Sequence, residues 1–267
     1  MSRLTDRPAL LRNRARAAAT GPELFLHERL RDDIEDRLAM VNRAFTAPAV
    51  VTGWPTIWDG WNGAKVITDD ALLSLEENAH DLVIHALSLH WADDPVGQLV
   101  QCRRALKPDG LLITALFGGE TLHELRAALA TAESQITGGL APRVLPMGEI
   151  RDLGNLLNRA GLALPVADSD EVTVRYDSAL HLMRDLRQMG EANAMESRLR
   201  RPTTRGLMLE AARLYADIHG EDGRIPATFE IVTLTGWAPA PDQPQPLKPG
   251  SASHRLDDIL RDLRNET

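Results

Sequence analysis

The sequence predicts an α/β fold, with a largely parallel sheet that helices cover on both faces. Short apolar stretches of strand length alternate with amphipathic stretches of about 10 to 15 residues, which is the order of consecutive strand–helix–strand units. The run at 111–117 is continuously apolar, as a central parallel strand is. A chain of 267 residues with 43% hydrophobic residues is also long enough for one large domain with a substantial core.

The first 46 residues are predicted to form a helical segment. Leu30, Ile34 and Leu38 recur at helical spacing within 9–45, His27 lies in the same stripe, and Pro48 ends the helix. We interpret this segment as a helix that lies on the domain, with a partner-binding arm as the alternative. Three arginines of this segment are predicted to form a solvated face, namely Arg12, Arg14 and Arg16.

The alternating elements occupy 47–238, which is predicted to be the main domain. Strands are expected at 49–52, 64–68, 81–86, 111–117, 171–176 and 228–237. Helices are expected at 95–106, 120–135, 148–160, 178–189 and 203–219. Residues 239–267 are predicted to be a proline-rich linker and tail, with a short docked helix at 256–263.

Composition and charge restrict the partners and the location. A formal net charge of −8 argues against a nucleic-acid partner, because phosphate binding needs a basic surface. The single cysteine, Cys102, excludes an internal disulfide and suits a reducing compartment. No apolar run approaches the roughly 20 residues that a transmembrane helix needs. We therefore expect a cytoplasmic protein, with a peripheral position at the inner face of the membrane as an open alternative.

Three segments at fixed spacing carry a family resemblance. DLV at 81–83, LHW at 89–91 and LKPDGLL at 106–112 form one strand, loop, helix, turn and strand. This region resembles the fourth-to-fifth strand region of class I S-adenosylmethionine-dependent methyltransferases. The resemblance implies a Rossmann-like class I methyltransferase sheet, mostly parallel with an antiparallel last strand.

Other segments narrow the resemblance to one family. They are FGGETLHELR at 117–126, RDLG at 151–154, MGEANA at 189–194 and IPATF at 225–229. They resemble the bacterial relatives of the methyltransferase-like assembly factor of respiratory complex I, an arginine hydroxylase in mitochondria. Those relatives are often labelled after the malonyl-carrier-protein methyltransferase of biotin synthesis. The resemblance covers nearly the whole chain apart from one gap.

The gap removes the motif that binds the cofactor in such methyltransferases. They hold S-adenosylmethionine on a glycine-rich loop after the first strand, where the backbone must approach the ligand closely. Here the first predicted strand runs into Gly53 to Gly63, which contain a proline and three tryptophans. A complete βαβ unit takes about 30 residues, so only a short connection fits. The sheet is therefore predicted to be truncated at its first βαβ unit, with extra helices at the N-terminus.

Two interpretations of this gap stay open. In the first, the cofactor site is lost and Trp54, Trp58 and Trp61 cover the exposed end of the sheet. In the second, the tryptophans line a rebuilt pocket. If S-adenosylmethionine binds, its candidate contacts are Trp54, Asp69 and Leu87. A helix N-cap or a surface acid is the alternative role of Asp69.

Eight residues are candidates for a substrate or partner pocket, because they follow strands or lie in the family-like segments. They are His90, Trp91, Gly118, Gly119, Glu124, Arg126, Glu191 and Asn193. Each has a structural alternative: aromatic packing for the first pair, a turn for the glycines, surface pairing for Glu124 and Arg126, and capping for the last two.

No metal site is expected. His80, His85 and His90 are spaced by five residues, which suits neither one face of a strand nor one face of a helix. Oxygen chemistry would need iron or another redox cofactor. The sequence therefore gives no ligand set for a hydroxylase reaction.

These observations favour a non-methylating protein with an eroded cofactor site, one that binds a partner polypeptide in complex I maturation. The expected partner is a protein, with a complex I subunit as the candidate, and no resident cofactor is expected. A homodimer is an open alternative, because the deletion leaves an unpaired sheet edge. The alternative function is that of an S-adenosylmethionine-dependent methyltransferase with a remodelled site. A pocket for an unrelated small ligand is the third hypothesis. Catalytic residues are not assigned.

Overall fold

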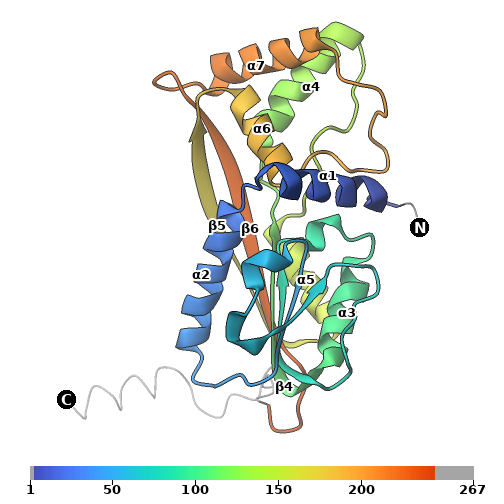
Figure 1. Cartoon of the computed structure of the whole chain (residues 1–267), viewed down its shortest axis with the longest axis vertical. Helices are drawn as coiled ribbons and strands as arrows, with labels where there is room; N and C mark the ends of the chain where they lie inside the picture. The colour runs from blue at the N-terminus through green and yellow to red at the C-terminus, as the bar shows by residue number, and fades with distance from the viewer. Residues whose placement is uncertain (1–2, 244–267) are drawn as a thin grey trace, which may run out of the picture.

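The computed structural model describes residues 3–243 and has one six-stranded sheet at its centre (Figure 1). Its strands are β1 (Pro48–Thr52), β2 (Lys65–Thr68), β3 (His80–Ala86), β4 (Leu106–Phe117), β5 (Ala163–Tyr176) and β6 (Ile225–Trp237). Their order across the sheet is β2-β1-β3-β4-β6-β5. The first four strands pair in parallel, and β6 runs antiparallel to both β4 and β5. The predicted α/β class, with a mostly parallel sheet and an antiparallel last strand, is confirmed.

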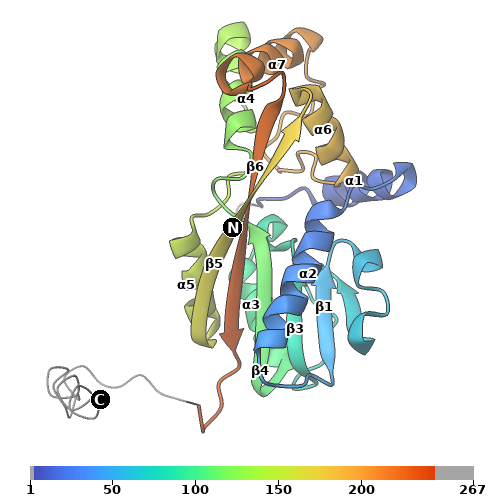
Figure 2. The ribbon, with the colours of Figure 1, turned by 90° about the vertical axis from the view of Figure 1, so that its left-hand side faces the viewer.

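Seven α-helices and three short 3-10 turns surround the sheet in the described part of the chain. They are α1 (Arg7–Thr20), α2 (Phe25–Met40), α3 (Pro95–Ala105), α4 (His123–Thr137), α5 (Ile150–Ala160), α6 (Ala179–Gln188) and α7 (Arg205–His219), with η1 (Pro55–Trp58), η2 (Trp61–Gly63) and η3 (Leu89–Trp91). α2 packs on one face of the parallel strands, and α3 and α5 pack on the other (Figure 2).

Side chains that alternate along the strands build the two halves of the core. In β1, Val50 contributes to the cluster under α2, and its neighbour Val51 contributes to the cluster under α3 and α5. Leu82 and Val83 divide in the same way in β3. Because successive strand residues point to opposite faces, a continuous apolar run needs helices on both sides.

The N-terminal stretch is two helices, and the prediction of one helix over 9–45 was wrong. Asp6 caps α1 by accepting a hydrogen bond from the Ala9 backbone, and α1 ends where Gly21 adopts a positive φ of 94°. Pro22 follows, which cannot donate the next helical hydrogen bond. The break turns α1 across the carboxyl ends of the parallel strands, while α2 runs along the sheet (Figures 1 and 2).

A helical layer of α4, α6 and α7 lies beyond the carboxyl ends of the parallel strands, against the extended ends of β5 and β6 (Figure 1). β5 is much longer than the predicted strand at 171–176. Its first half escaped prediction because it is a polar edge strand that contains Pro165, which an edge tolerates. The long β5–β6 pair connects this upper layer to the sheet.

Only η1 and η2 connect the parallel neighbours β1 and β2, as the short sequence between them predicted. The three tryptophans of this connection do not share one place. Trp58 is fully buried in the cluster under α2, where its ring meets that of Trp61 edge-on at 5.2 Å. Trp54 alone lies at the end of β1, near His27. A common tryptophan cover at the sheet end is therefore absent.

No helix among residues 3–243 is both long and apolar enough to cross a membrane. The short helix predicted at 256–263 lies outside the described residues, as does most of the predicted linker. At the opposite edge from β5, β2 is the unpaired outer strand of the described sheet.

Candidate functional site

The candidate site lies at the carboxyl edge of the parallel strands, where open α/β sheets bind their ligands. Gly53 follows β1, Asp69 follows β2, Leu87 follows β3 and Gly118 follows β4. Parallel pairing brings these positions to one edge of the sheet. α1 and the segment after α6 close over this edge (Figure 1).

An arginine of α1 occupies this edge. Arg14 Nη1 donates to both carboxylate oxygens of Asp69, at 2.8 and 2.9 Å, and Arg7 Nη2 donates to Oδ1 at 2.8 Å. The Arg14 and Asp69 side chains are only 7% and 3% exposed. Burial alone would raise the pKa of Asp69, but the charges and hydrogen bonds of Arg14 and Arg7 lower it to about 2.

Two expectations are therefore wrong. Arg14 is not part of a solvated face, although Arg12 and Arg16 beside it are exposed. Asp69 is neither a helix N-cap nor a surface acid, because it is the buried counter-ion of Arg14. The sequence did not reveal this pair because its members lie 55 residues apart.

Two glycines make room for the Arg14 side chain. A Cβ added at Gly53 would overlap the Arg14 guanidinium. A Cβ added at Gly190 would lie 2.9 Å from Arg14 Cγ and 3.1 Å from the Trp54 ring. Glycine is thus needed after β1 for close approach, as in a cofactor loop, but the approaching group is a side chain of the same chain.

Three of the predicted pocket residues meet in a second cluster beside Arg14. Trp91 Nε1 donates to Glu191 Oε2 at 2.7 Å, and His90 Nε2 lies 3.3 Å from the same oxygen. Burial would raise the pKa of Glu191, but its hydrogen bonds with His90 and Trp91 and the charge of Arg14 lower it. The His90 ring also packs on Phe117, with 4.9 Å between the ring centres.

Sequence reasoning missed His27 as a member of this region. It is buried, and burial lowers its pKa to about 4. The sequence signal that could have predicted its burial was its position in the apolar stripe of the N-terminal segment. Several buried nitrogens here have no hydrogen-bond partner among the described residues, namely Arg14 Nε, His27 Nδ1, Trp54 Nε1 and His90 Nδ1.

Two further candidates, Glu124 and Arg126, lie near the start of α4 and have structural roles. Glu124 is buried and accepts a 2.6 Å hydrogen bond from Thr228 Oγ1 of β6. Arg126 donates to the backbone oxygens of Gly119 and Thr121, at 3.2 and 3.1 Å. Surface pairing of Glu124 and Arg126 is therefore wrong. The Glu124 contact fixes α4 against β6, and the Arg126 contacts fix the loop before α4.

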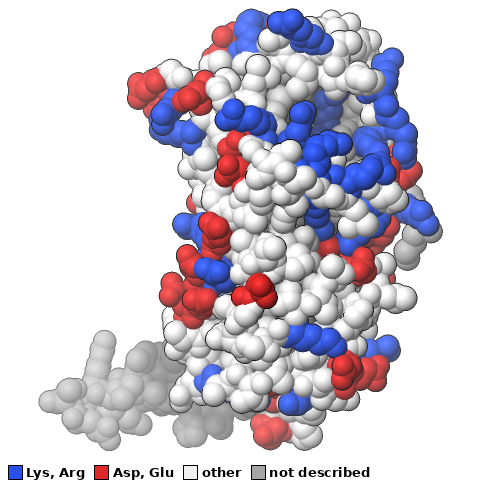
Figure 3. Space-filling model, viewed as in Figure 1, with Lys and Arg blue, Asp and Glu red and all other residues white. Residues whose placement is uncertain are grey.

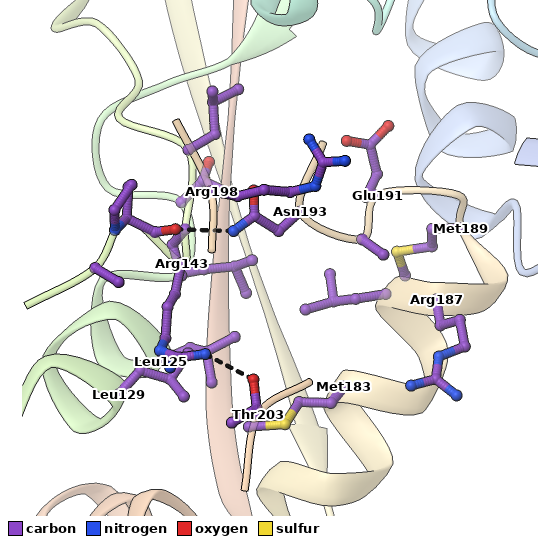
Figure 4. A pocket seen from close by; sticks show the side chains of 18 of the residues that line it. Leu125, Leu129, Arg143, Met183, Arg187, Met189, Glu191, Asn193, Arg198 and Thr203 are labelled. Atoms are coloured by element: carbon purple, nitrogen blue, oxygen red, sulfur yellow. Dashed lines mark hydrogen bonds between the residues drawn. The ribbon is translucent and has the colours of Figure 1, made fainter. Parts of the chain in front are cut away.

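Three further candidates, Asn193, Gly118 and Leu87, stabilise the loops and strand ends around the site. Asn193 Nδ2 donates to the Pro142 carbonyl at 2.9 Å and joins two loops (Figure 4). Gly118 packs so tightly on Glu230 that a Cβ there would clash. Leu87 is buried with a positive φ of 41°, and its backbone N–H donates to the Ala115 carbonyl.

A cavity of about 440 Å³ opens beside Glu191, between α4, α6 and the segments around them (Figure 4). Trp91, Glu191 and Asn193 are the predicted candidates that line it. Leucine and methionine side chains of α4 and α6 form much of the wall, and four arginines also line it. Within residues 3–243, no group of three or more His, Cys, Asp or Glu side chains is placed to hold a metal ion.

The sequence of this chain is similar to those of several known proteins. A family model described as "Methyltransferase domain" matches residues 55–114. The arginine-hydroxylase NDUFAF5 of Danio rerio is 45% identical over 200 residues, which cover 73% of this chain and 61% of that protein. A malonyl-[acyl-carrier protein] O-methyltransferase of Xylella fastidiosa is 34% identical over 180 residues, which cover 67% of this chain and 59% of that protein. The match thus spans less than two thirds of either relative.

Among solved structures, the YcgJ protein of a Bacillus species aligns with a TM-score of 0.48 and 10% identity. This alignment covers 78% of the present chain and 97% of the other.

Proposed function

We propose that this chain, a methyltransferase-like homologue of the arginine-hydroxylase NDUFAF5 proteins, is a non-methylating, partner-binding factor in the maturation of respiratory complex I. Its partner in this proposal is a complex I subunit, met at the inner face of the membrane. The role in complex I maturation is inferred from the family resemblance. The absence of methyl transfer is inferred from the geometry of the sheet edge.

The single observation that carries the proposal is the position of Arg14. Its guanidinium lies against the backbone at Gly53, where methyltransferases of this fold class seat their cofactor on a glycine-rich loop. It also uses both oxygens of Asp69, the acid at the end of the neighbouring strand. S-adenosylmethionine therefore finds neither open backbone nor a free carboxylate at this edge. The residues present do not fit this cofactor, and we assign no methyl-transfer step.

The free energy of the buried Arg14–Asp69 ion pair also opposes binding of S-adenosylmethionine. Removing one partner from a buried ion pair costs about 3–5 kcal/mol, because the other charge is left buried without compensation. A ligand that had to displace Arg14 from Asp69 would bind through a rarely populated state. Its apparent affinity would then fall by roughly 10²- to 10⁴-fold.

Deletion of the gene in its native cell tests the assembly role. Fully assembled complex I, separated on native gels and assayed by NADH oxidation, should fall and should recover when the chain is supplied again. A tagged copy should capture a complex I subunit from detergent-solubilised membranes, and the tag alone should not. Unchanged complex I in the deletion strain, or capture of no complex I subunit, would contradict the proposal.

A further inference from the structure

The 440 Å³ cavity has a wall that is largely apolar. Its volume lies within the range of about 300–1,000 Å³ found for pockets that hold small ligands. Leu125 and Leu129 of α4 face Met183 of α6 across it (Figure 4). Phe229 of β6 also lines it, as does Met208 of α7. Methionine side chains adapt to ligands of variable shape, so this wall suits a flexible apolar body.

The charged groups at the cavity are almost all cationic. Among the described residues, four arginines line it, namely Arg143, Arg187, Arg198 and Arg201, and Glu191 is the one acidic residue that does. The whole chain carries a net charge of −8, so this local excess runs against the overall charge. Figure 3 shows Lys and Arg gathered on this face, over α1 and the segment between α6 and α7.

Two of these arginines have partners and two do not. Arg143 pairs with Glu133 at 2.6 Å, and Arg198 pairs with Asp6 at 2.7 Å. The side chains of Arg187 and Arg201 are exposed and form no ion pair or hydrogen bond with any residue in the described part of the chain, although the charge of Arg201 contributes to the lowered pKa of Glu133. Glu191 contacts Trp91 and His90, and among the described residues it forms no ion pair with either arginine.

A peptide would not suit this combination. An extended backbone placed along the cavity would bring N–H and C=O groups against leucine and methionine side chains, where they would lose their hydrogen bonds. An unbranched acyl chain carries no such groups along its length. A head group with anionic oxygens at its end would meet the planar donor fork of an arginine, which binds carboxylates and phosphates in pairs of hydrogen bonds.

We propose that this cavity binds a single-chain amphiphile, with its acyl chain between α4 and α6 and its oxyanion head group at Arg187 and Arg201. Binding requires neither a protein partner nor S-adenosylmethionine, so this inference is independent of the complex I role. Carboxylate and phosphate head groups share the recognition chemistry, and titration of each distinguishes them.

Calorimetric titration of the full chain tests this directly, with decanoate, decyl phosphate, octanoate and decanol as probes. At least one of the two anionic ten-carbon probes should bind at one site per chain. Decanol should bind at least tenfold more weakly, because it lacks the charge-assisted hydrogen bonds. Octanoate should bind about tenfold more weakly than decanoate, because it buries two fewer methylene groups.

Variants locate the site. Arg187→Gln and Arg201→Gln should each weaken anionic binding about tenfold, whereas Arg213→Gln on the exposed side of α7 should leave it unchanged. Met208→Trp should block all probes by filling the cavity, and its thermal melting curve shows whether it folds. Equal affinity for decanol and both anions, no saturable binding, or binding that the three cavity variants leave intact would overturn the proposal. None of these results would bear on the capture of a complex I subunit.

Discussion

Arg14 is buried, although the sequence around it predicts an exposed side chain. It lies on an arginine-rich helix with exposed neighbours on both sides, and yet its side chain is buried against Asp69 and the backbone at Gly53. An ion pair in this position is costly to break, because both charges are already out of water. The stability of the fold and the proposed exclusion of the cofactor therefore depend on the same contact.

Replacement of Arg14 by methionine should lower the free energy of unfolding by about 3 kcal/mol, because Asp69 keeps only Arg7. Arg12→Met on the same helix is the matched control and should change it by less than about 0.5 kcal/mol, since Arg12 is exposed. Urea unfolding at pH 7 measures both. Equal effects of the two substitutions would show that the buried pair contributes nothing specific.

His27 makes stability depend on pH. Its folded-state pKa is about 4, below the usual 6.5, because burial disfavours the imidazolium. Between these values the unfolded chain binds a proton that the folded chain does not, so the free energy of unfolding falls as the pH drops. From pH 7 to pH 5 the loss from His27 is about 2 kcal/mol.

Urea unfolding of wild type and His27→Leu at both pH values checks this dependence. The loss between pH 7 and pH 5 should be smaller in the variant by about 2 kcal/mol. The variant's own stability at pH 7 does not enter the comparison, because only the difference between the two pH values is used. An identical loss in both proteins would rule out a buried neutral His27.

At the scale of elements, the position after β1 has room for glycine only. Gly53→Ala should destabilise the fold by about 1–3 kcal/mol, because the added methyl group overlaps the Arg14 guanidinium. Gly139→Ala is its control, because a Cβ there meets nothing within 4 Å and the backbone φ is not positive. Thermal unfolding compares them, and a Gly53→Ala variant as stable as wild type would argue against close packing of Arg14 at this strand end.

The start of α4 depends on a hydrogen bond to the last strand. Glu124→Ala should cost about 2 kcal/mol, because it leaves the buried Thr228 hydroxyl and backbone N–H without their acceptor. Glu120→Ala, in the turn that precedes α4 and exposed, should change stability by less than about 0.5 kcal/mol. Native-state hydrogen exchange adds a local readout, since α4 amides should lose protection only in the first variant.

Elements with strong local signals could be predicted from the sequence. β3 and β4 contain mostly apolar segments that are buried throughout, at 82–86 and at 111–117, and the composition of such segments identifies them without tertiary information. The first half of β5 could not be predicted in this way, because an edge strand needs no apolar pattern. The break in the N-terminal helix had a signal in Gly21-Pro22, which the apolar periodicity on both sides outweighed.

The candidate site was predictable only in part, for a similar reason. His90, Trp91 and Glu191 were selected from motifs, and they meet as neighbours. Arg14 and His27 were missed as site residues, because each is buried only by segments distant in sequence. Long-range ion pairs leave no trace in local periodicity, which is why Arg14 was predicted to be solvated.

At the scale of the whole molecule, the N-terminal helices cover a sheet whose first two strands are joined only by η1 and η2. α1 covers the carboxyl edge with Arg14, while α2 covers one face of the sheet. The layer of α4, α6 and α7 then encloses a separate cavity beside that edge (Figures 1 and 4). The architecture thus separates the buried Arg14–Asp69 pair at the carboxyl edge from the cavity beside it.

Calorimetric titration of S-adenosylmethionine and S-adenosylhomocysteine into the full chain tests the closed cofactor position most directly, with a thermal-shift assay in parallel and an active methyltransferase as positive control. A ligand at 100 times its dissociation constant would stabilise the fold by about 2.7 kcal/mol, which both methods detect. We expect no heat of binding and no thermal shift for either ligand. Saturable micromolar binding of either one to the wild-type chain would contradict this expectation.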